Sequence, residues 1–271
     1  MYLGHAEIEE KVTMVHFVGA GCGAPDLITV RGMYLLGKAD IIIYAGSLVN
    51  PELLNYAKEP CKIYNSAKMT LEAVMDVFLD ASEEGLDLVR LHTGDPSLYG
   101  AVREQMDLLD QAKIPYDVTP GVTAAFGAAA SLGIEYTLPE VSQTLILTRM
   151  DGKTSVPDKE KMESLAAHQA SMAIYLSAAM LDELTDRLIA GGYPPDTPAA
   201  LVYKASWADE RSWLCSLKDL AETGRKNRIT KTALVLVGDA VAHRTYARSK
   251  LYDPDFSTEY RRGGMSASRE E

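Results

Sequence analysis

Residues Val89 to Gly100 read V-R-L-H-T-G-D-P-S-L-Y-G, a buried-strand pattern that runs into a glycine-proline turn and then into helix-forming sequence. Gly94 permits a positive φ or a close backbone approach, Pro96 fixes φ and removes a donor, and Asp95 offers an acceptor. Ligands of parallel α/β sheets bind beyond the carboxyl ends of the strands, where this turn lies. The stretch therefore indicates an α/β fold with a small-molecule pocket, although an ordinary turn capped by Asp95 is an equal alternative.

A second strand, glycine loop and helix lie near the N-terminus. The strand Met14–Val18 runs into G-A-G-C-G-A at residues 19–24, and a helical pattern follows from Leu27 to Lys38. The loop literally satisfies the dinucleotide fingerprint, which also calls for an acidic residue about 20 positions on, at the end of the next strand. That strand, Ile41–Tyr44, lacks the acid, and Asp40 lies at its wrong end. A nicotinamide-dependent oxidoreductase is thus a disfavoured alternative of a different class.

Length and composition favour a folded chain with one large or two medium domains. The sequence has 271 residues, 47% of them hydrophobic, which is ordinary for a globular protein. No apolar run approaches the roughly 18 residues of a membrane span, and the acidic stretch through Lys11 lacks the apolar core of a signal peptide, so we expect a cytoplasmic protein. The 3 cysteines and 5 histidines show no C-x-x-C or H-x-x-x-H spacing, which argues against disulfides and a metal site.

The charge distribution argues against a nucleic-acid partner. The formal net charge is −11, whereas phosphate neutralisation needs clustered lysine and arginine. The basic and aromatic stretch from Arg244 to Arg262 is polar and aperiodic, which is typical of a tail that is mobile or packed on a partner. We therefore expect a small-molecule ligand, no nucleic acid and no membrane.

Short apolar runs alternate with helical segments along the chain, which predicts parallel sheets covered on both faces. Four strands are expected near Val15, Ile42, Ile63 and Val89, followed by a strand at 115–118. Further strands are expected at 143–148, 171–176, 199–203 and 232–237, with helices at 70–84, 97–113 and 122–132. Pro120-Gly121 resembles a domain joint, and the segment 149–158 is expected to be a loop. The predicted organisation is two α/β domains, residues 13–119 and 120–242, with a polar tail at 243–271.

Taken in order, these segments resemble the tetrapyrrole (corrin and porphyrin) methyltransferase family over roughly residues 14–238. The motifs that carry the resemblance are V-G-A-G-C-G at 18–23 with D-L-I-T at 26–29, T-G-D-P at 93–96 and T-P-G-V-T-A at 119–124. The segments at 44–49, 92–100, 143–149 and 202–207 resemble the subgroup that methylates C-11 of precorrin-4 or cobalt-precorrin-4 in cobalamin biosynthesis. The family usually has proline and aspartate flanking the third loop glycine, where this chain has Cys22 and Ala24.

The resemblance implies two α/β domains with the active site in the cleft between them, a homodimer, and S-adenosylmethionine as methyl donor. The residues that it implies for the cofactor are Thr93, Gly94, Asp95, Leu98, Tyr99, Thr123, Ala124, Tyr175, Leu176, Tyr203, Lys204 and Ala205. Those that it implies for the tetrapyrrole are Gly21, Asp26, Ser47 and Arg149. Leu176 and Ala205 have core packing as an alternative. No residue is singled out as nucleophile or general base, and no metal is expected on the protein.

The net negative charge of the chain opposes the binding of a polycarboxylate substrate, so basic side chains near the site must bind its carboxylates. Arg149 is the preferred candidate, because it ends a strand beside the expected loop; Arg31, Lys153 and Arg211 are alternatives. Other acceptors remain open: another tetrapyrrole position, such as uroporphyrinogen III in siroheme synthesis, or a protein or RNA. A non-catalytic module that binds S-adenosylmethionine is a further alternative.

Overall fold

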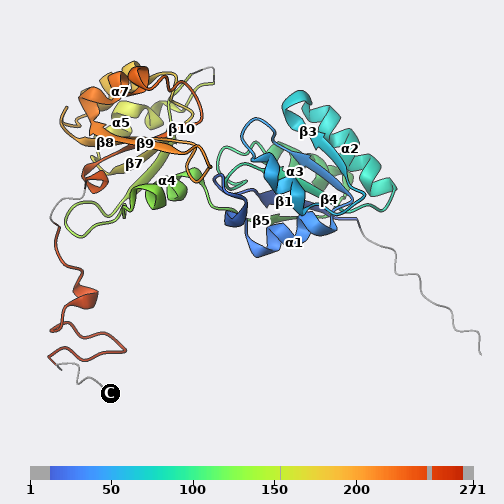
Figure 1. Cartoon of the computed structure of the whole chain (residues 1–271), viewed down its shortest axis with the longest axis horizontal. Helices are drawn as coiled ribbons and strands as arrows, with labels where there is room; N and C mark the ends of the chain where they lie inside the picture. Colours follow the sequence, from blue (N-terminus) through green and yellow to red (C-terminus); the bar gives the residue numbers. More distant parts are fainter. Residues whose placement is uncertain (1–12, 153, 243–245, 265–271) are drawn as a thin grey trace, which may run out of the picture. The chain divides into compact units, whose positions relative to one another are not determined.

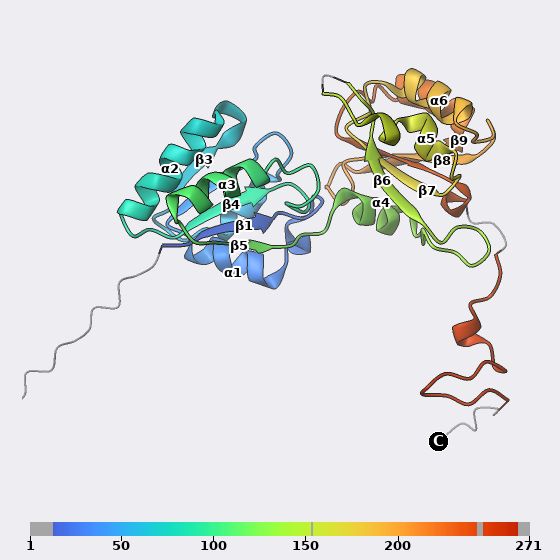
Figure 2. The same cartoon turned by 180° about the vertical axis from the view of Figure 1, so that it is seen from behind.

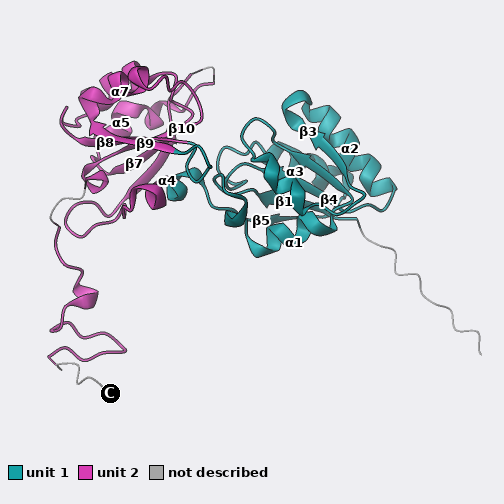
Figure 3. Ribbon diagram, viewed as in Figure 1, with its two compact units in different colours: residues 1–127, 204–210 teal, residues 128–203, 211–271 magenta. Residues whose placement is uncertain are grey.

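The computed structural model describes residues 13–152, 154–242 and 246–264. The chain divides into two compact units, one formed by Met1–Gly127 with Lys204–Glu210 and the other by Ala128–Tyr203 with Arg211–Glu271 (Figure 3). Residues 120–127 and 204–210, which the sequence pattern groups with the second domain, therefore belong to unit 1.

Unit 1 is built on a parallel sheet of order β3-β2-β4-β1-β5. Its strands are β1 (Val15–Gly19), β2 (Ile41–Tyr44), β3 (Lys62–Asn65), β4 (Leu88–His92) and β5 (Tyr116–Thr119). Helix α1 (Val30–Lys38) lies on one face, and α2 (Leu71–Glu83) and α3 (Arg103–Ala112) lie on the other (Figures 1 and 2). The predicted parallel sheet with two covered faces is confirmed for this unit.

Side chains on the two sides of this sheet enter different cores, because neighbours along a strand point to opposite faces. Phe17 packs with Phe78 and Leu109 on the side of α2 and α3. Val18 packs with Leu36 on the side of α1. Every residue of β4 is buried, as expected of a central strand in a parallel sheet.

Local sequence sets the helix starts in unit 1. The Thr70 hydroxyl accepts a hydrogen bond from Ala73 N at 3.3 Å, which confirms the expected N-cap of α2. The predicted helix 27–38 is wrong at its start, because Thr29 caps α1 with its hydroxyl on Gly32 N at 3.0 Å. The predicted helix 97–113 is also too long, since positive φ values at Tyr99 and Ala101 interrupt it before α3 begins at Arg103.

Unit 2 contains a mixed sheet of order β6-β7-β10-β8-β9, so a purely parallel second sheet is wrong. Its strands are β6 (Leu145–Arg149), β7 (Ser171–Tyr175), β8 (Pro198–Tyr203), β9 (Arg211–Ser216) and β10 (Ala233–Val237). β6 and β7 are parallel, β10 is antiparallel to β7 and β8, and β9 is antiparallel to β8. β6, β7 and β8 therefore run in one direction and end at the same edge. β9 was not expected from the sequence.

The helices of unit 2 cover both faces of its sheet. α5 (Met162–Ala166), α6 (Leu181–Ala190) and α7 (Leu220–Lys226) lie on one face (Figures 1 and 2). Their apolar side chains, including Leu184 and Leu220, form one core with strand residues such as Ile174. Residues 128–132 of the alanine-rich α4 (Ala124–Leu132) lie on the opposite face.

Short 3-10 helices occupy several connections, at Pro25–Leu27, Pro51–Tyr56, Ser66–Lys68, Asp158–Glu160, Leu217–Asp219, Asp239–Val241 and Lys250–Tyr252. The segment 150–157 has no helix or strand in its described residues, in line with the expected loop. Within the described ranges, no helix combines the length and apolar character needed to cross a membrane.

Candidate active site

The loops after β1, β4 and β5 meet at the carboxyl edge of the unit 1 sheet, because these strands are neighbours. Gly94 N donates to Gly21 O at 2.9 Å, and Gly21 N donates to Gly94 O at 3.3 Å. Ala20 N donates to His92 O at 2.6 Å. The first glycine loop and the Thr93–Pro96 turn are thus joined through their backbones.

Three glycines allow these loops to cross at backbone distance. A Cβ added to Gly19 would lie 2.6 Å from Gly121 Cα and 2.7 Å from Gly94 O. A Cβ added to Gly121 would lie 2.8 Å from Gly19 Cα and would overlap Gly94 O. Gly94 itself has φ +61°, a left-handed conformation that side chains disfavour. Gly19, Gly94 and Gly121 are far apart in the sequence, but all three lie where the loops after β1, β4 and β5 cross.

The Asp95 carboxylate joins the turn after β4 to the segment after β5. Oδ1 accepts hydrogen bonds from Ser97 N at 2.8 Å and Ser97 Oγ at 2.5 Å, and Oδ2 accepts one from Gly121 N at 2.9 Å. Burial acts to raise the pKa of Asp95, but the hydrogen bonds from Ser97 and Gly121 outweigh it and leave this pKa below its ordinary value. Asp95 is therefore both a turn cap, as in the simpler alternative, and a brace between two loops.

A polar layer lies directly beneath this edge. Arg90 is 6% exposed and donates to Gln105 Oε1 and to Ile43 O, each at 3.2 Å. His92 is 4% exposed and stacks on Phe17 with ring centroids 6.3 Å apart. Burial and the nearby Arg90 charge lower the pKa of His92 to about 3. His92 is thus a buried, neutral strand histidine.

The segment 204–210 returns to unit 1 and packs on the first glycine loop. The Ser206 hydroxyl accepts from Ala24 N at 3.0 Å and lies 3.2 Å from Cys22 Sγ. A Cβ on Gly23 would lie 2.6 Å from Nε1 of Trp207. Asn50 holds the other side of the loop, since its Nδ2 donates to Gly23 O at 3.0 Å. The sequence singled out the segment 202–207 through the subgroup resemblance, but it gave no signal that the Ser206 hydroxyl or the Asn50 amide contacts the first loop, because each contact spans distant segments.

The remaining candidates of unit 1 lie around the same carboxyl edge or on the first loop. Tyr99 is 44% exposed at φ +55°, and Thr123 lies beside Gly94, whose added Cβ would be 3.5 Å from Thr123 Cα. Ala205 is 6% exposed, so it belongs to the packed part of its segment. Thr93 is half-buried, and its Oγ1 is a buried atom without a hydrogen-bond partner among the described residues. Of the other candidates in this unit, Leu98 and Ala124 are half-buried, and Asp26 and Ser47 are exposed. Lys204 has a left-handed backbone, with φ +49°.

The candidates of unit 2 end the strands that run in one direction. Arg149 ends β6, Tyr175 ends β7 and Tyr203 ends β8. Leu176, directly after β7, is 64% exposed at φ +55°. Core packing of Leu176 is therefore wrong, and an apolar side chain held outward at a strand end is suited to contact a ligand.

The Arg149 guanidinium holds the loop that follows β6. Nη1 donates to Met150 O at 3.0 Å and to Thr154 O at 3.2 Å, and Nη2 donates to Ser155 O at 2.9 Å. Of the alternative cations, Arg31 is exposed, and Arg211 lies over the Tyr203 ring at 5.1 Å. Lys153 lies outside the described residues. Arg149 therefore already has backbone partners where a substrate carboxylate was expected to bind.

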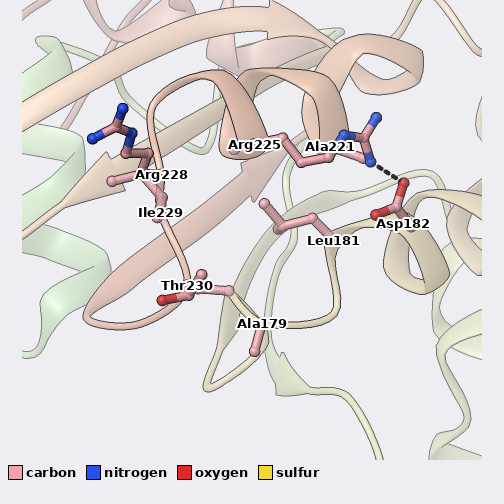
Figure 4. A pocket seen from close by; sticks show the side chains of 10 residues that line it. Ala179, Leu181, Asp182, Ala221, Arg225, Arg228, Ile229 and Thr230 are labelled. Atoms are coloured by element: carbon pink, nitrogen blue, oxygen red, sulfur yellow. Dashed lines mark hydrogen bonds and ion pairs between the residues drawn. The ribbon is translucent and has the colours of Figure 1, made fainter.

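A cavity of about 370 Å³ lies between α6 and α7 in unit 2. Leu181, Thr230 and Arg225 line it, and Arg225 is paired with Asp182 (Figure 4). Arg228, which also lines the cavity, points away from Thr230 and Ala179 in this view. No group of His, Cys, Asp and Glu side chains in the part of the chain that the structure describes has the arrangement of a metal site.

In unit 1 the loops that carry the sequence motifs lie together, and comparison with known proteins assigns the family. The family model of tetrapyrrole (corrin/porphyrin) methylases matches residues 14–221. The chain belongs to the tetrapyrrole methylase family. Within this methylase family it is 52% identical over 248 residues to the cobalt-precorrin-4 C(11)-methyltransferase of Methanocaldococcus jannaschii, covering 92% of this chain and 96% of that protein.

Two further relatives agree with this assignment. The precorrin-4 C(11)-methyltransferase of Pseudomonas aeruginosa is 43% identical over 249 residues, covering 92% of this chain and 99% of that protein. An X-ray structure of cobalt precorrin-4 methyltransferase, a cobalamin biosynthetic enzyme, superposes with a TM-score of 0.85 at 41% identity, covering 88% of this chain and all of that one. The two-domain methylase fold is thus confirmed.

Proposed function

We propose that this chain is an S-adenosylmethionine-dependent methyltransferase that methylates C-11 of cobalt-precorrin-4 in cobalamin biosynthesis. The observation that carries the proposal is the 52% identity, over nearly the whole length of both chains, to a protein of that name. Precorrin-4 without cobalt is the next acceptor, because relatives with that name are 43% identical or less. Methylation of uroporphyrinogen III is the more distant alternative.

The residues at the carboxyl edge of unit 1 suit the proposed cofactor. Gly94 exposes backbone at a left-handed turn, and Thr93 Oγ1 is a buried oxygen without a partner among the described residues. Apolar side chains such as Leu98 and Leu176 offer surface to an adenine ring or a thioether. We propose that Thr93, Gly94, Asp95, Leu98, Tyr99, Thr123, Ala124, Tyr175, Leu176, Tyr203, Lys204 and Ala205 contact S-adenosylmethionine.

In the proposed reaction the main task of the protein is to position the two substrates, because the methyl group is already activated. S-adenosylmethionine, when bound, supplies an activated methyl group and its own leaving group. The chain's residues would then align an electron-rich ring carbon and exclude water, which for well-oriented partners contributes on the order of 7–11 kcal/mol. The tightly packed loops at Gly19, Gly94 and Gly121 are suited to this task, because a rigid backbone can hold the cofactor and the tetrapyrrole in a fixed relative position. We propose Gly21, Asp26, Ser47 and Arg149 as contacts of the tetrapyrrole.

A binding experiment followed by an acceptor comparison tests the proposal. Calorimetric titration should give saturable binding of S-adenosylhomocysteine, the demethylated product, and none of NADH. Purified protein should then transfer one methyl group to cobalt-precorrin-4 faster than to precorrin-4 or uroporphyrinogen III. Binding of NADH alone would refute the methyltransferase, and binding without turnover of any tetrapyrrole would favour the non-catalytic module.

Two further proposals concern assembly and location. We propose that the protein works as a homodimer, as the family resemblance implies, and that it lies in the cytoplasm. Light scattering coupled to size-exclusion chromatography would test the first, and fractionation of cells that express the chain would test the second. A monomer at working concentration would contradict the proposed dimer.

A further inference from the structure

We propose that Ser206 is a positioning residue that fixes the first glycine loop against the segment 204–210 and thereby sets the binding of the tetrapyrrole. The inference rests on the proposed function and adds a residue to it. Ser206 touches residues 22 and 24, which lie between two proposed substrate contacts, Gly21 and Asp26. Its hydroxyl is therefore placed to control the loop that carries both.

The glycine loop depends on side chains from elsewhere for its backbone hydrogen bonds. Ala24 N has Ser206 Oγ as acceptor, and Gly23 O has Asn50 Nδ2 as donor. The bond from Ala24 N to Ser206 Oγ is partly buried, so water would replace the lost acceptor only in part. Loss of the Ser206 hydroxyl would leave Ala24 N without this acceptor and free one side of the loop.

The segment that carries Ser206 is braced independently of the loop. Ser206 has φ +66°, and its backbone N–H donates to the Glu210 carboxylate. Lys204 pairs with Asp209 at 2.7 Å and lies over the Trp207 ring at 5.0 Å from its centroid. Trp207 N donates to Lys204 O at 3.0 Å. These contacts do not use the Ser206 hydroxyl, so its removal should leave the segment in place.

Packing on both sides of Cys22 adds a second link. Cys22 Sγ lies 3.2 Å from Ser206 Oγ, and a Cβ on Gly127 would lie 2.6 Å from the same sulfur. Cys22 is 9% exposed, so this contact is packed and not at the surface. The Ser206 side chain therefore holds the loop at two residues, Cys22 and Ala24.

The test compares Ser206→Gly and Ser206→Ala with Ser216→Ala as control. Both Ser206 variants lose the hydroxyl, but only glycine relieves the left-handed backbone at φ +66°. Ser216→Ala removes a hydroxyl that is bonded to Asp219 in unit 2. Hydrogen exchange at Ala24 should accelerate about threefold to tenfold in both Ser206 variants and stay unchanged in the control.

The steady-state constants separate positioning from a merely structural role. Both Ser206 variants should raise KM for the tetrapyrrole about threefold to tenfold, with the S-adenosylhomocysteine Kd within about twofold of the parent. Ser206→Gly with the parent KM, or an equal increase in KM and Kd, would overturn the inference. If the parent protein methylates no tetrapyrrole, the proposed function is refuted instead. Faster hydrogen exchange at Ala24 in the Ser206 variants would then show that Ser206 has only a structural role.

Discussion

At the scale of single residues, Asp95 combines a capping role with a bracing role. Asp95→Asn keeps the shape but leaves only one acceptor oxygen for donors at Ser97 and Gly121. We expect a loss of about 1–3 kcal/mol in unfolding free energy and weaker binding of S-adenosylhomocysteine by calorimetry. Asp107→Asn is the matched control, because it removes only an exposed ion pair with Arg103. Equal losses in the two variants would contradict the role of Asp95.

The lowered pKa of Asp95 predicts how its contribution depends on pH. A carboxyl with a lower pKa in the folded state adds stability above its unfolded pKa of about 3.9 and loses it as pH falls through the folded value. The Tm difference between parent and Asp95→Asn should therefore be constant near neutrality and shrink below about pH 4. A difference that grows on acidification would show that Asp95 is not held as a carboxylate.

Arg149 allows a test between charge and geometry. Its two terminal nitrogens bond three backbone carbonyls of the following loop, which a lysine ammonium cannot reproduce from one point. If loop positioning dominates, Arg149→Lys and Arg149→Ala should raise the tetrapyrrole KM alike, with little change in S-adenosylhomocysteine affinity. A lysine variant that keeps the parent KM would show that the positive charge itself binds a substrate carboxylate.

At the scale of elements, the glycine crossing and helix α1 should respond oppositely to an added methyl group. Gly121→Ala overlaps the backbone of Gly94 and Gly19, and we expect a loss of about 1–3 kcal/mol. Gly37→Ala adds a methyl on α1, 3.5 Å from Tyr56 O, and should stabilise by about 0.5–1 kcal/mol. Denaturant titration measures both. A tolerated Gly121→Ala would mean that the loops separate at little cost.

The buried strands of both units were predictable, because a strand covered on two faces forms a continuous apolar run. β4 is buried throughout, whereas β9 reads R-S-W-L-C-S, without a continuous apolar run or an alternating pattern, and is exposed or half-buried at the sheet edge. That pattern gave no strand signal, so β9 and the antiparallel pairing were missed. The start of α3 was missed because positive φ at Tyr99 and Ala101 depends on their packing.

The meeting of the loops at the site was predictable in the same way. Parallel neighbouring strands deliver their following residues to one edge, so Gly21, Gly94 and Gly121 had to converge. Side chains that arrive from a remote segment carry no such local signal. Ser206 and Asn50 reach the first loop across separations of 182 and 27 residues.

At the scale of the whole molecule, net charge predicts a salt effect. The chain carries −11, and the proposed substrate is a polycarboxylate, so long-range repulsion should slow their encounter. Raising ionic strength from about 10 mM to about 150 mM shortens the Debye length from about 30 Å to about 8 Å. We expect kcat/KM for the tetrapyrrole to rise and the S-adenosylhomocysteine Kd to stay constant. A fall in kcat/KM would show that a local cationic cluster dominates.

The return of residues 204–210 to unit 1 has a consequence for synthesis on the ribosome. The sheet of unit 1 is encoded before residue 120, yet the partners of Gly23 and Ala24 are Trp207 and Ser206. Ala24 and Ser206 are 182 residues apart, so at about 5–20 residues per second roughly 9–36 seconds of translation separate the glycine loop from the segment that completes it. During that interval the sheet strands of unit 1 are already made while the ligand-facing edge is unfinished, so a chain that stops before Ser206 would lack the partners of the glycine loop.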